Sequence, residues 1–341
     1  MYYFCTLFDK NYLFRGLALY DSLIRHCPDF KFWILCLDNE AYEMLEKLNL
    51  DKVVLISMAE FEDEELLAVK KTRSQLEYYW TLSPALPSYV LNKNPQIPSI
   101  AYLDSDLFFF ADPKPLYDEL GDGSVLIMEH KLPEGKKHKE KDVGKYNVGM
   151  MLFNNNAEGR KCLEWWRQKC NEWCYYKVEP TRFADQKYLD YFAEKFKGVV
   201  VSKHEGANLS YWNMKNFRDR LKKIGGQIYI KGDQLIFFHF SGIKFYDPLS
   251  KFLPRGPLDP YTLPSREKRL IYSIYFKATL YSIKKILAVD QDFRHGFIIR
   301  PNIFKQLKDV FWPMAEQSIK KNSGPLRPLL AKIKKIMKKK S

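Results

Sequence analysis

The stretch that decides the fold is IAYLDSDLFFF, residues 100–110, in which two carboxylates stand between two apolar runs. The apolar residues predict a buried strand that ends at Asp104 and Asp106. Carboxylates are costly to bury without a cationic partner, so the pair predicts a bound cation. Two hard oxygen donors this close together suit Mn²⁺ or Mg²⁺ bridging to the phosphates of a nucleotide. A solvated turn in which one aspartate caps a helix is the alternative, and the apolar flanks favour the metal.

Upstream of this stretch the chain alternates between strand and helix patterns. Residues 2–8, 32–37 and 52–57 are predicted strands, and residues 13–26 and 40–48 are predicted helices. This βαβαβ order predicts a mostly parallel sheet with right-handed crossovers and helices on both faces. Such sheets bind ligands at the carboxyl ends of their strands, which places the turn at 8–12 and the aspartate pair on one edge. The sequence has neither a dinucleotide fingerprint nor a P-loop, so a nucleotide at that edge needs a metal.

Composition bounds the class of protein. The 341 residues are 46% hydrophobic and 16% aromatic, enough for a large α/β domain with an appendage and too apolar for general disorder. The chain opens on a strand pattern without a charged leader, and no stretch of about 18 residues is free of charge. We therefore expect a cytoplasmic protein that does not span the membrane. The six cysteines lack paired Cys-x-x-Cys spacing, which predicts reduced thiols, with a disulfide or zinc site as the alternative.

Positive charge is concentrated at the C-terminus. Residues 264–341 contain 19 Lys and Arg against 5 Asp and Glu, a net of +14 that equals the charge of the whole chain. Between the last lysines, apolar residues recur at helical spacing: Leu326, Leu329, Leu330, Ile333 and Met337. This basic amphipathic pattern suits the surface of an anionic membrane, at about 1 kcal/mol per basic residue, with a frayed solvated tail as the alternative. Without a zinc, helix-turn-helix or RNA-recognition signature, we expect no nucleic-acid partner.

Five short motifs carry a family resemblance. In chain order they are DKNY (9–12), DSD (104–106), NVGMMLFN (147–154), DQ (185–186) and HFSGIK (239–244). Together, over residues 1–250, they resemble nucleotide-sugar glycosyltransferases of the GT-A fold, and in particular glycosyltransferase family 8 and its bacterial relatives. The resemblance implies a mostly parallel mixed sheet flanked by helices, with a Rossmann-like nucleotide half. It also implies divalent-metal-dependent transfer of a hexose from a UDP-sugar, with retention at the anomeric carbon.

The resemblance further implies which residues bind the metal and the nucleoside. It assigns three metal ligands, Asp104, Asp106 and His239. Asp9, Asn11 and Tyr12 match the turn that holds uracil and ribose. A carboxylate can accept the uracil imide proton and a tyrosine ring can stack on the base. Turn formation by Asp9 and Asn11, with Tyr12 as a packing residue, is the alternative.

Four residues are candidates for the diphosphate. Gly242 allows close backbone approach and Lys244 supplies a positive charge, although the family has two residues between this Gly and Lys and here there is one. Arg73 matches an arginine near the donor, with a helix-surface charge as the alternative. Arg15 is predicted to reach the phosphates from the first helix.

The sugar end is assigned to a third group. By resemblance Gln186 lies near the anomeric carbon, Asp185 binds sugar hydroxyls and Asn147 contacts the sugar, while a helix cap is the alternative for Asp185. Asn208 and Trp212 belong to a polar and aromatic loop, 206–213, of the composition that binds pyranoses. A further aromatic group is predicted to be helical and to serve as core or as a membrane-facing rim: Trp165, Trp166, Trp173, Tyr175 and Tyr176.

These observations predict three parts and one function. Residues 1–253 form the transferase domain, 254–265 a Pro-rich linker, and 266–341 a helical basic tail that associates with a membrane. The protein is expected on the inner face of the membrane, moving a hexose to a glycan or lipid-linked acceptor in cell-surface polysaccharide or lipopolysaccharide synthesis. The alternatives are a sugar-nucleotide hydrolase or nucleotidyltransferase, and a non-catalytic membrane-bound protein that binds nucleotide sugars.

Overall fold

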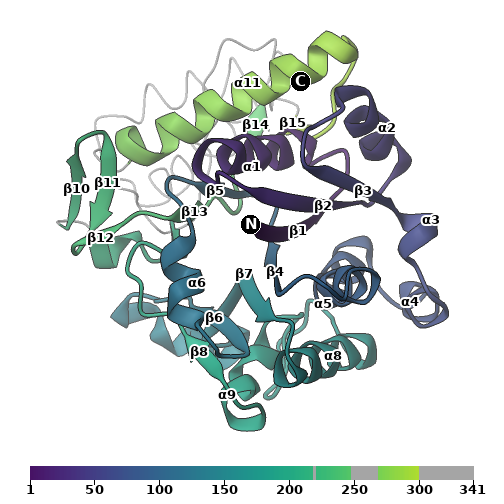
Figure 1. Cartoon of the computed structure of the whole chain (residues 1–341), viewed down its shortest axis with the longest axis vertical. Coiled ribbons are helices and arrows are strands. Elements are labelled where there is room, and N and C mark those ends of the chain that lie inside the picture. The colour runs from purple at the N-terminus through teal and green to yellow at the C-terminus, as the bar shows by residue number, and fades with distance from the viewer. Residues whose placement is uncertain (218–219, 247–267, 299–341) are drawn as a thin grey trace, which may run out of the picture. The chain divides into compact units, whose positions relative to one another are not determined.

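The computed structural model describes residues 1–217, 220–246 and 268–298 (Figure 1). The chain forms two compact units, one of residues 1–245 with 254–296 and one of residues 246–253 with 297–341. Nearly all described residues belong to the first unit. The predicted linker at 254–265 and the predicted amphipathic helix at 326–340 lie outside the described residues.

A seven-stranded sheet forms the centre of the first unit. Its order is β3 (Val53–Ser57), β2 (Phe30–Cys36), β1 (Tyr2–Phe8), β4 (Ser99–Leu103), β7 (Tyr146–Asn154), β6 (Val125–Glu129) and β8 (Val199–Val201). Strands β3, β2, β1 and β4 run parallel to one another, β7 runs antiparallel to both β4 and β6, and β8 runs parallel to β6. The predicted fold class, a mostly parallel mixed sheet flanked by helices, is confirmed.

Helices connect the strands, and several of them pack on the sheet. They are α1 (Leu13–His26), α2 (Asn39–Leu48), α3 (Met58–Phe61), α4 (Glu64–Lys70), α5 (Gln75–Lys93), α6 (Lys114–Leu120), α7 (Glu140–Val143), α8 (Ala157–Glu172) and α9 (Phe192–Lys195). Helices α5 and α8 pack together and share one core cluster with the sheet (Figure 1). Side-chain caps start several of them: Asp38 for α2, Asp63 for α4 and Asn156 for α8, while Ser74 and Glu77 form a capping box at α5.

Short strands build the second half of the site. Strand β13 (Phe237–His239) lies between β5 (Leu107–Phe109) and β9 (Leu209–Ser210). A separate antiparallel sheet is made of β10 (Leu221–Ile224), β11 (Gln227–Ile230) and β12 (Asp233–Gln234). The remaining short elements are η1 (Glu134–Lys139), η2 (Lys187–Tyr191), η3 (Met214–Phe217), η4 (Lys268–Tyr272), β14 (Phe245–Tyr246) and β15 (Phe297–Ile298).

Helix α11 (Ser273–Val289) follows the predicted linker and belongs to the first unit. It lies along α1 (Figure 1), where Lys285 Nζ donates to Asp21 Oδ1 at 2.8 Å. The Tyr275 ring stacks on Phe240 with 3.8 Å between ring centroids. This part of the C-terminal third is therefore packed against the sheet unit, and the predicted domain boundaries stay a prediction.

Two sequence-based expectations can be compared directly with the described residues. All six cysteines are buried free thiols, in agreement with the prediction. In the part of the chain that the structure describes, no helix combines the length and the apolar character needed to cross a bilayer.

Candidate active site

A cavity of about 620 Å³ opens at the carboxyl ends of β1 and β4. Its walls come from segments far apart in the sequence: the turn after β1, the Asp104–Asp106 turn, the first turns of α5, β7 and the end of β13. The predicted sheet edge is therefore the edge that is hollowed. The volume is that of a site for a nucleotide or a small ligand.

Asp104, Asp106 and His239 lie together in this cavity and could hold a metal ion. His239 Nε2 is 3.0 Å from Asp106 Oδ1 and 3.6 Å from Asp104 Oδ2. The register of β5 and β13 brings them together, because His239 pairs with Leu107, the residue after Asp106. Phe240 N also donates to Asp106 O at 2.9 Å. Two carboxylates and one imidazole form a hard donor set that suits Mn²⁺ or Mg²⁺.

The His239 ring is oriented by its neighbours. Its Nδ1 lies 3.2 Å from Asn147 Oδ1, and as a donor there it leaves Nε2 facing the two aspartates as the ligating atom. The Trp212 ring meets it edge-on, with 5.2 Å between centroids. On the third side is Gly149, where a Cβ would lie 2.7 Å from both Asn147 Oδ1 and His239 Nδ1. Only glycine leaves room for this ring.

The electrostatics of the group also favour a cation. Burial raises the pKa of Asp104 to about 6, with Asp106 adding to the rise and His239 opposing it. Burial works to raise the pKa of Asp106 as well, but the charge and hydrogen bond of His239 outweigh it and hold that pKa below its usual value. Burial alone would lower the pKa of His239, and the two carboxylates reverse the shift. The same two carboxylates that raise the pKa of His239 would also favour a bound cation.

The turn after β1 places Asp9, Asn11 and Tyr12 on the cavity wall. The Asp9 carboxylate accepts from Asn11 N at 2.9 Å and from Asn11 Nδ2 at 3.0 Å. Gly296 N donates to Asn11 Oδ1 at 3.2 Å, so the same asparagine also bonds the segment after α11. The alternative turn-forming role of Asp9 and Asn11 is thus real, and it coexists with their position in the cavity.

None of the four predicted phosphate-binding residues lines the cavity. Arg15 is buried and donates to Asn11 O and Ile243 O, each at 2.9 Å. These two bonds link the turn after β1 to the segment after β13. Gly242, with a φ of 73°, and Lys244 are both exposed on that segment.

Arg73 lies elsewhere. Its guanidinium is 3.9 Å from the centroid of the Tyr175 ring, and its Nη2 donates to Asn171 O at 3.1 Å. It joins the turn after α4 to the C-terminal end of α8. In this structure Arg73 therefore supports local packing.

The predicted sugar-binding residues divide into two groups. Gln186, Asn147 and Trp212 line the cavity, whereas Asp185 and Asn208 do not. Gln186 Oε1 accepts from Asn147 Nδ2 at 3.1 Å, and Gln186 Nε2 donates to Val143 O at 2.8 Å. Asp185 is buried beside this pair, and burial, together with the charge of Asp104, raises its pKa to about 7.

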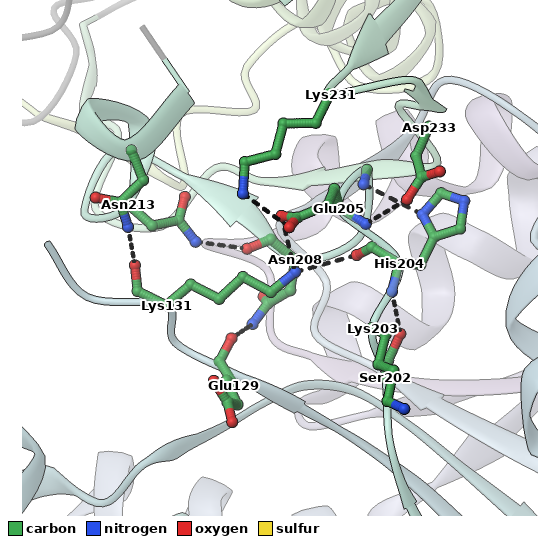
Figure 2. Close-up of polar contacts among 12 residues, drawn as sticks. Glu129, Lys131, Ser202, Lys203, His204, Glu205, Asn208, Asn213, Lys231 and Asp233 are labelled. Carbon is green, nitrogen blue, oxygen red and sulfur yellow. Dashed lines mark hydrogen bonds and ion pairs between the residues drawn. The ribbon is translucent and has the colours of Figure 1, made fainter. Parts of the chain in front are cut away.

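Asn208 does not line the cavity and instead makes hydrogen bonds with neighbouring segments (Figure 2). Its side-chain Nδ2 donates to Glu129 O at 3.0 Å, and its backbone carbonyl accepts from Asn213 Nδ2 at 2.9 Å. Close by, Lys131 Nζ donates to His204 O at 3.1 Å and lies 3.5 Å from Glu205. These contacts hold the segment that leaves β6.

That segment carries a cavity residue that the sequence reasoning missed. His130 lines the cavity, and its carbonyl accepts from Trp212 Nε1 at 3.1 Å and Asn213 Nδ2 at 2.9 Å. Burial lowers the pKa of the His130 imidazole to about 4, so the ring is neutral. Its place directly after the strand 125–129, which opens with the apolar run 125–128, was the available signal. Residues from α5 were missed too, namely Gln75, Leu76, Tyr79, Trp80 and Ser83.

The aromatic group at 165–176 is only partly as predicted. Helix α8 ends at Glu172, so Trp173, Tyr175 and Tyr176 lie beyond it. Trp166 is fully buried core, as expected, and its Nε1 donates to Asp185 O at 2.8 Å. Tyr176 was predicted to be helical and is instead a loop residue that is 71% exposed.

Comparison with known proteins places the chain in a family. The model of a family described as glycosyl transferase family 8 matches residues 5–204. The chain is 37% identical over 248 residues to the uncharacterized protein YfnF of Bacillus subtilis (strain 168), covering 71% of this chain and 81% of that protein. It is 35% identical over 244 residues to YfnD of the same organism, covering 71% and 78%.

Solved structures are similar at lower identity. The galactosyltransferase LgtC in complex with donor and acceptor sugar analogs is 17% identical, with a TM-score of 0.48 and coverage of 79% of this chain and 100% of that one. The glycosyltransferase GlyE of Streptococcus pneumoniae is also 17% identical, with a TM-score of 0.47 and coverage of 93% and 72%.

Proposed function

The chain belongs to glycosyl transferase family 8, and from this we propose that it moves a hexose from a UDP-sugar to a glycan or lipid-linked acceptor with the help of Mn²⁺ or Mg²⁺. One observation carries the proposal. A single cavity holds the Asp104, Asp106 and His239 group together with the turn after β1 and the Asn147–Gln186 pair. These are the parts needed to bind a diphosphate, a nucleoside and a sugar.

Asp104, Asp106 and His239 would hold the cation. When bound, the cation neutralises the diphosphate and makes UDP a better leaving group. The protein holds the three ligands ready, because β5–β13 pairing sets the position of His239 and Asn147 sets the orientation of its ring.

The turn after β1 would bind the nucleoside. Asp9 retains acceptor capacity beyond its bonds to Asn11 and can accept the uracil imide proton. The Tyr12 ring, 40% exposed, is available to stack on the base. Arg15 supports this end indirectly, since its bonds to the backbone hold the turn in place.

We propose transfer with retention, which the family resemblance implies, and without a covalent intermediate. Gln186 and Asn147 present carboxamides to the sugar, and neither can form a stable ester as a carboxylate nucleophile does. In the proposed step the bond from the anomeric carbon to the β-phosphate oxygen breaks, and the bond to the acceptor oxygen forms on the same face. The acceptor proton passes to the departing β-phosphate. Gln186 and neutral His130 orient the reactants, while Asp185, which is buried and does not line the cavity, lies next to Gln186 in the chain and would act only through it.

Calorimetric titration of UDP, with and without Mn²⁺, tests the core of this proposal. Wild type is expected to bind UDP more tightly with Mn²⁺ than without it. Asp106→Asn is expected to lose that difference and to lose transfer activity, while its unfolding free energy stays close to that of wild type. The matched control is Asp118→Asn on α6, an exposed aspartate paired with Lys114. Equal UDP binding with and without Mn²⁺ in wild type, or full transfer by Asp106→Asn, would remove the metal assignment.

The place of action is proposed from charge. The net of +14 in residues 264–341 supports a peripheral position on the anionic inner face of a membrane, and with it a role in cell-surface polysaccharide or lipopolysaccharide synthesis. Flotation with vesicles of phosphatidylglycerol and phosphatidylcholine tests this. Replacing Lys334, Lys335, Lys338 and Lys339 by Glu in the full chain should abolish flotation, whereas Arg at the same positions should preserve it. Equal flotation of the two variants would contradict the proposal.

A further inference from the structure

Large apolar side chains are exposed at one side of the cavity. Leu76 is 52% exposed and lines the cavity, and Tyr176 is 71% exposed. Trp80 follows Leu76 by one turn of α5 and also lines the cavity. The centroid of its ring lies 5.7 Å from that of Tyr176, and the Tyr176 centroid lies 5.8 Å from that of Phe183. We call Leu76, Trp80, Tyr176 and Phe183 the aromatic platform. Exposed apolar groups that continue from a cavity mark a binding surface.

The platform is held by specific contacts. Tyr176 N donates to Glu77 Oε1 at 2.8 Å, and Glu77 is the residue that closes the capping box of α5. Ala184 N donates to Tyr175 O at 3.2 Å, which folds the loop 175–184 back on itself. Tyr175 in turn lies against the Arg73 guanidinium. The rings are thus presented by a braced loop, and the chain reaches Gln186 three residues after Phe183.

Polar groups lie among the rings. Gln75 Nε2 donates to the Tyr79 hydroxyl at 2.6 Å beside Leu76, and Lys177 pairs with Glu179 at 2.8 Å just beyond Tyr176. An alkyl chain needs a continuous apolar groove, which these groups interrupt. A pyranose has an apolar C–H face for the rings and a hydroxyl edge for amides, carboxylates and phenols. The chemistry of the platform therefore matches a sugar.

We propose that the aromatic platform binds a pyranose ring of the acceptor and leads it to Gln186. This inference rests on the proposed function, because it identifies the acceptor of the proposed transfer as a neutral sugar. It also gives Tyr176 a part in acceptor recognition, whereas Arg73 acts as a positioning residue beneath the loop.

The test uses the full chain and three small probes. Saturation-transfer NMR is measured with methyl β-glucopyranoside, methyl β-galactopyranoside and octyl β-glucopyranoside, each with and without UDP and Mn²⁺. The variants are Tyr176→Ala and the conservative Tyr176→Phe. The matched control is Tyr281→Ala, which removes a tyrosine of similar exposure, 57%, from α11. UDP calorimetry is run on the same samples.

We expect wild type to transfer saturation to the ring protons of at least one methyl pyranoside. Tyr176→Ala should weaken that binding roughly three- to tenfold, while Tyr176→Phe and Tyr281→Ala keep it. UDP binding should be equal in all four proteins. Failure of wild type to bind any methyl pyranoside, an unchanged signal in Tyr176→Ala, or saturation confined to the octyl chain would each overturn the platform. Loss of UDP binding in wild type would instead count against the proposed function, since the pyranoside signal is read independently.

Discussion

Replacing Asp185 by Asn should stabilise the protein at alkaline pH. Burial is the largest reason that the pKa of Asp185 rises from 3.8 to about 7, and the charge of Asp104 adds to it. Because the folded pKa lies above the unfolded one, the folded chain resists ionisation of this carboxyl. Above pH 7 the folded chain carries the buried charge, at a cost of about 4 kcal/mol, and below about pH 4 both states are protonated and the cost vanishes.

The assay is urea unfolding of metal-free protein in EDTA, at intervals from pH 5 to pH 8.5. The contribution of Asp185 lowers wild-type stability by up to about 1.4 kcal/mol per pH unit as pH rises from 4 to 7. Asp185→Asn removes the ionisable proton, so the difference in unfolding free energy between variant and wild type should grow over this range. At pH 8 the variant should be more stable by roughly 2 to 4 kcal/mol.

The control is Asp118→Asn, which changes an exposed carboxylate and should leave the pH dependence of wild type in place. A constant difference between Asp185→Asn and wild type from pH 5 to pH 8.5 would refute the reasoning. So would a variant that is less stable than wild type at pH 8, since it would mean that the ionised carboxylate makes favourable contacts in the folded state.

Three further changes test the packing around the site. Gly149→Ala places a methyl group 2.7 Å from His239 Nδ1 and should weaken Mn²⁺ binding about 10- to 100-fold in an EPR titration. The control is Gly135→Ala, whose methyl group meets nothing within 4 Å and should leave Mn²⁺ affinity unchanged. Equal Mn²⁺ affinities of the two variants would contradict the steric argument. Arg73→Ala removes the contacts to Tyr175 and Asn171 and should lower the unfolding free energy by about 1 to 2 kcal/mol. UDP affinity, measured by calorimetry, should not change. A loss of UDP affinity would show that Arg73 contributes to donor binding. Phe153→Ala empties a fully buried position stacked on Trp166 and should cost about 3 to 5 kcal/mol in urea unfolding, and a cost below 1 kcal/mol would show that the core collapses around it.

Local order along the chain was readable from the sequence. The strands predicted at 2–8, 32–37 and 52–57 are β1, β2 and β3 to within two residues, and the helices predicted at 13–26 and 40–48 are α1 and α2. Hydrophobic periodicity and apolar runs act over a few residues, so they specify such elements directly. The position of the aspartate pair at the end of a buried strand followed from the same pattern, because charge interrupts an apolar run there.

Placement of side chains from distant segments was a different matter. His239 reaches the aspartates only because β13 pairs with β5 in one register, and a shift of one residue would turn its side chain to the other face. Asn208 lay in a loop of suitable composition, yet its amide is used on the Glu129 carbonyl. Arg73 had the right charge, but the Tyr175 ring and the end of α8 hold it away from the cavity wall.

The sequence by itself therefore determined the α/β class, the edge of the sheet at which the cavity lies and the residue types available there. Tertiary structure alone decided which of those residues meet. It brought His130, Leu76 and Trp80 to the cavity and kept Arg15, Arg73 and Lys244 away from its wall. The physical reason is the sequence distance over which each signal acts. Hydrophobic periodicity reports which face of a single element is buried, whereas contacts between residues 100 or more positions apart depend on strand register and loop conformation, which no local pattern encodes.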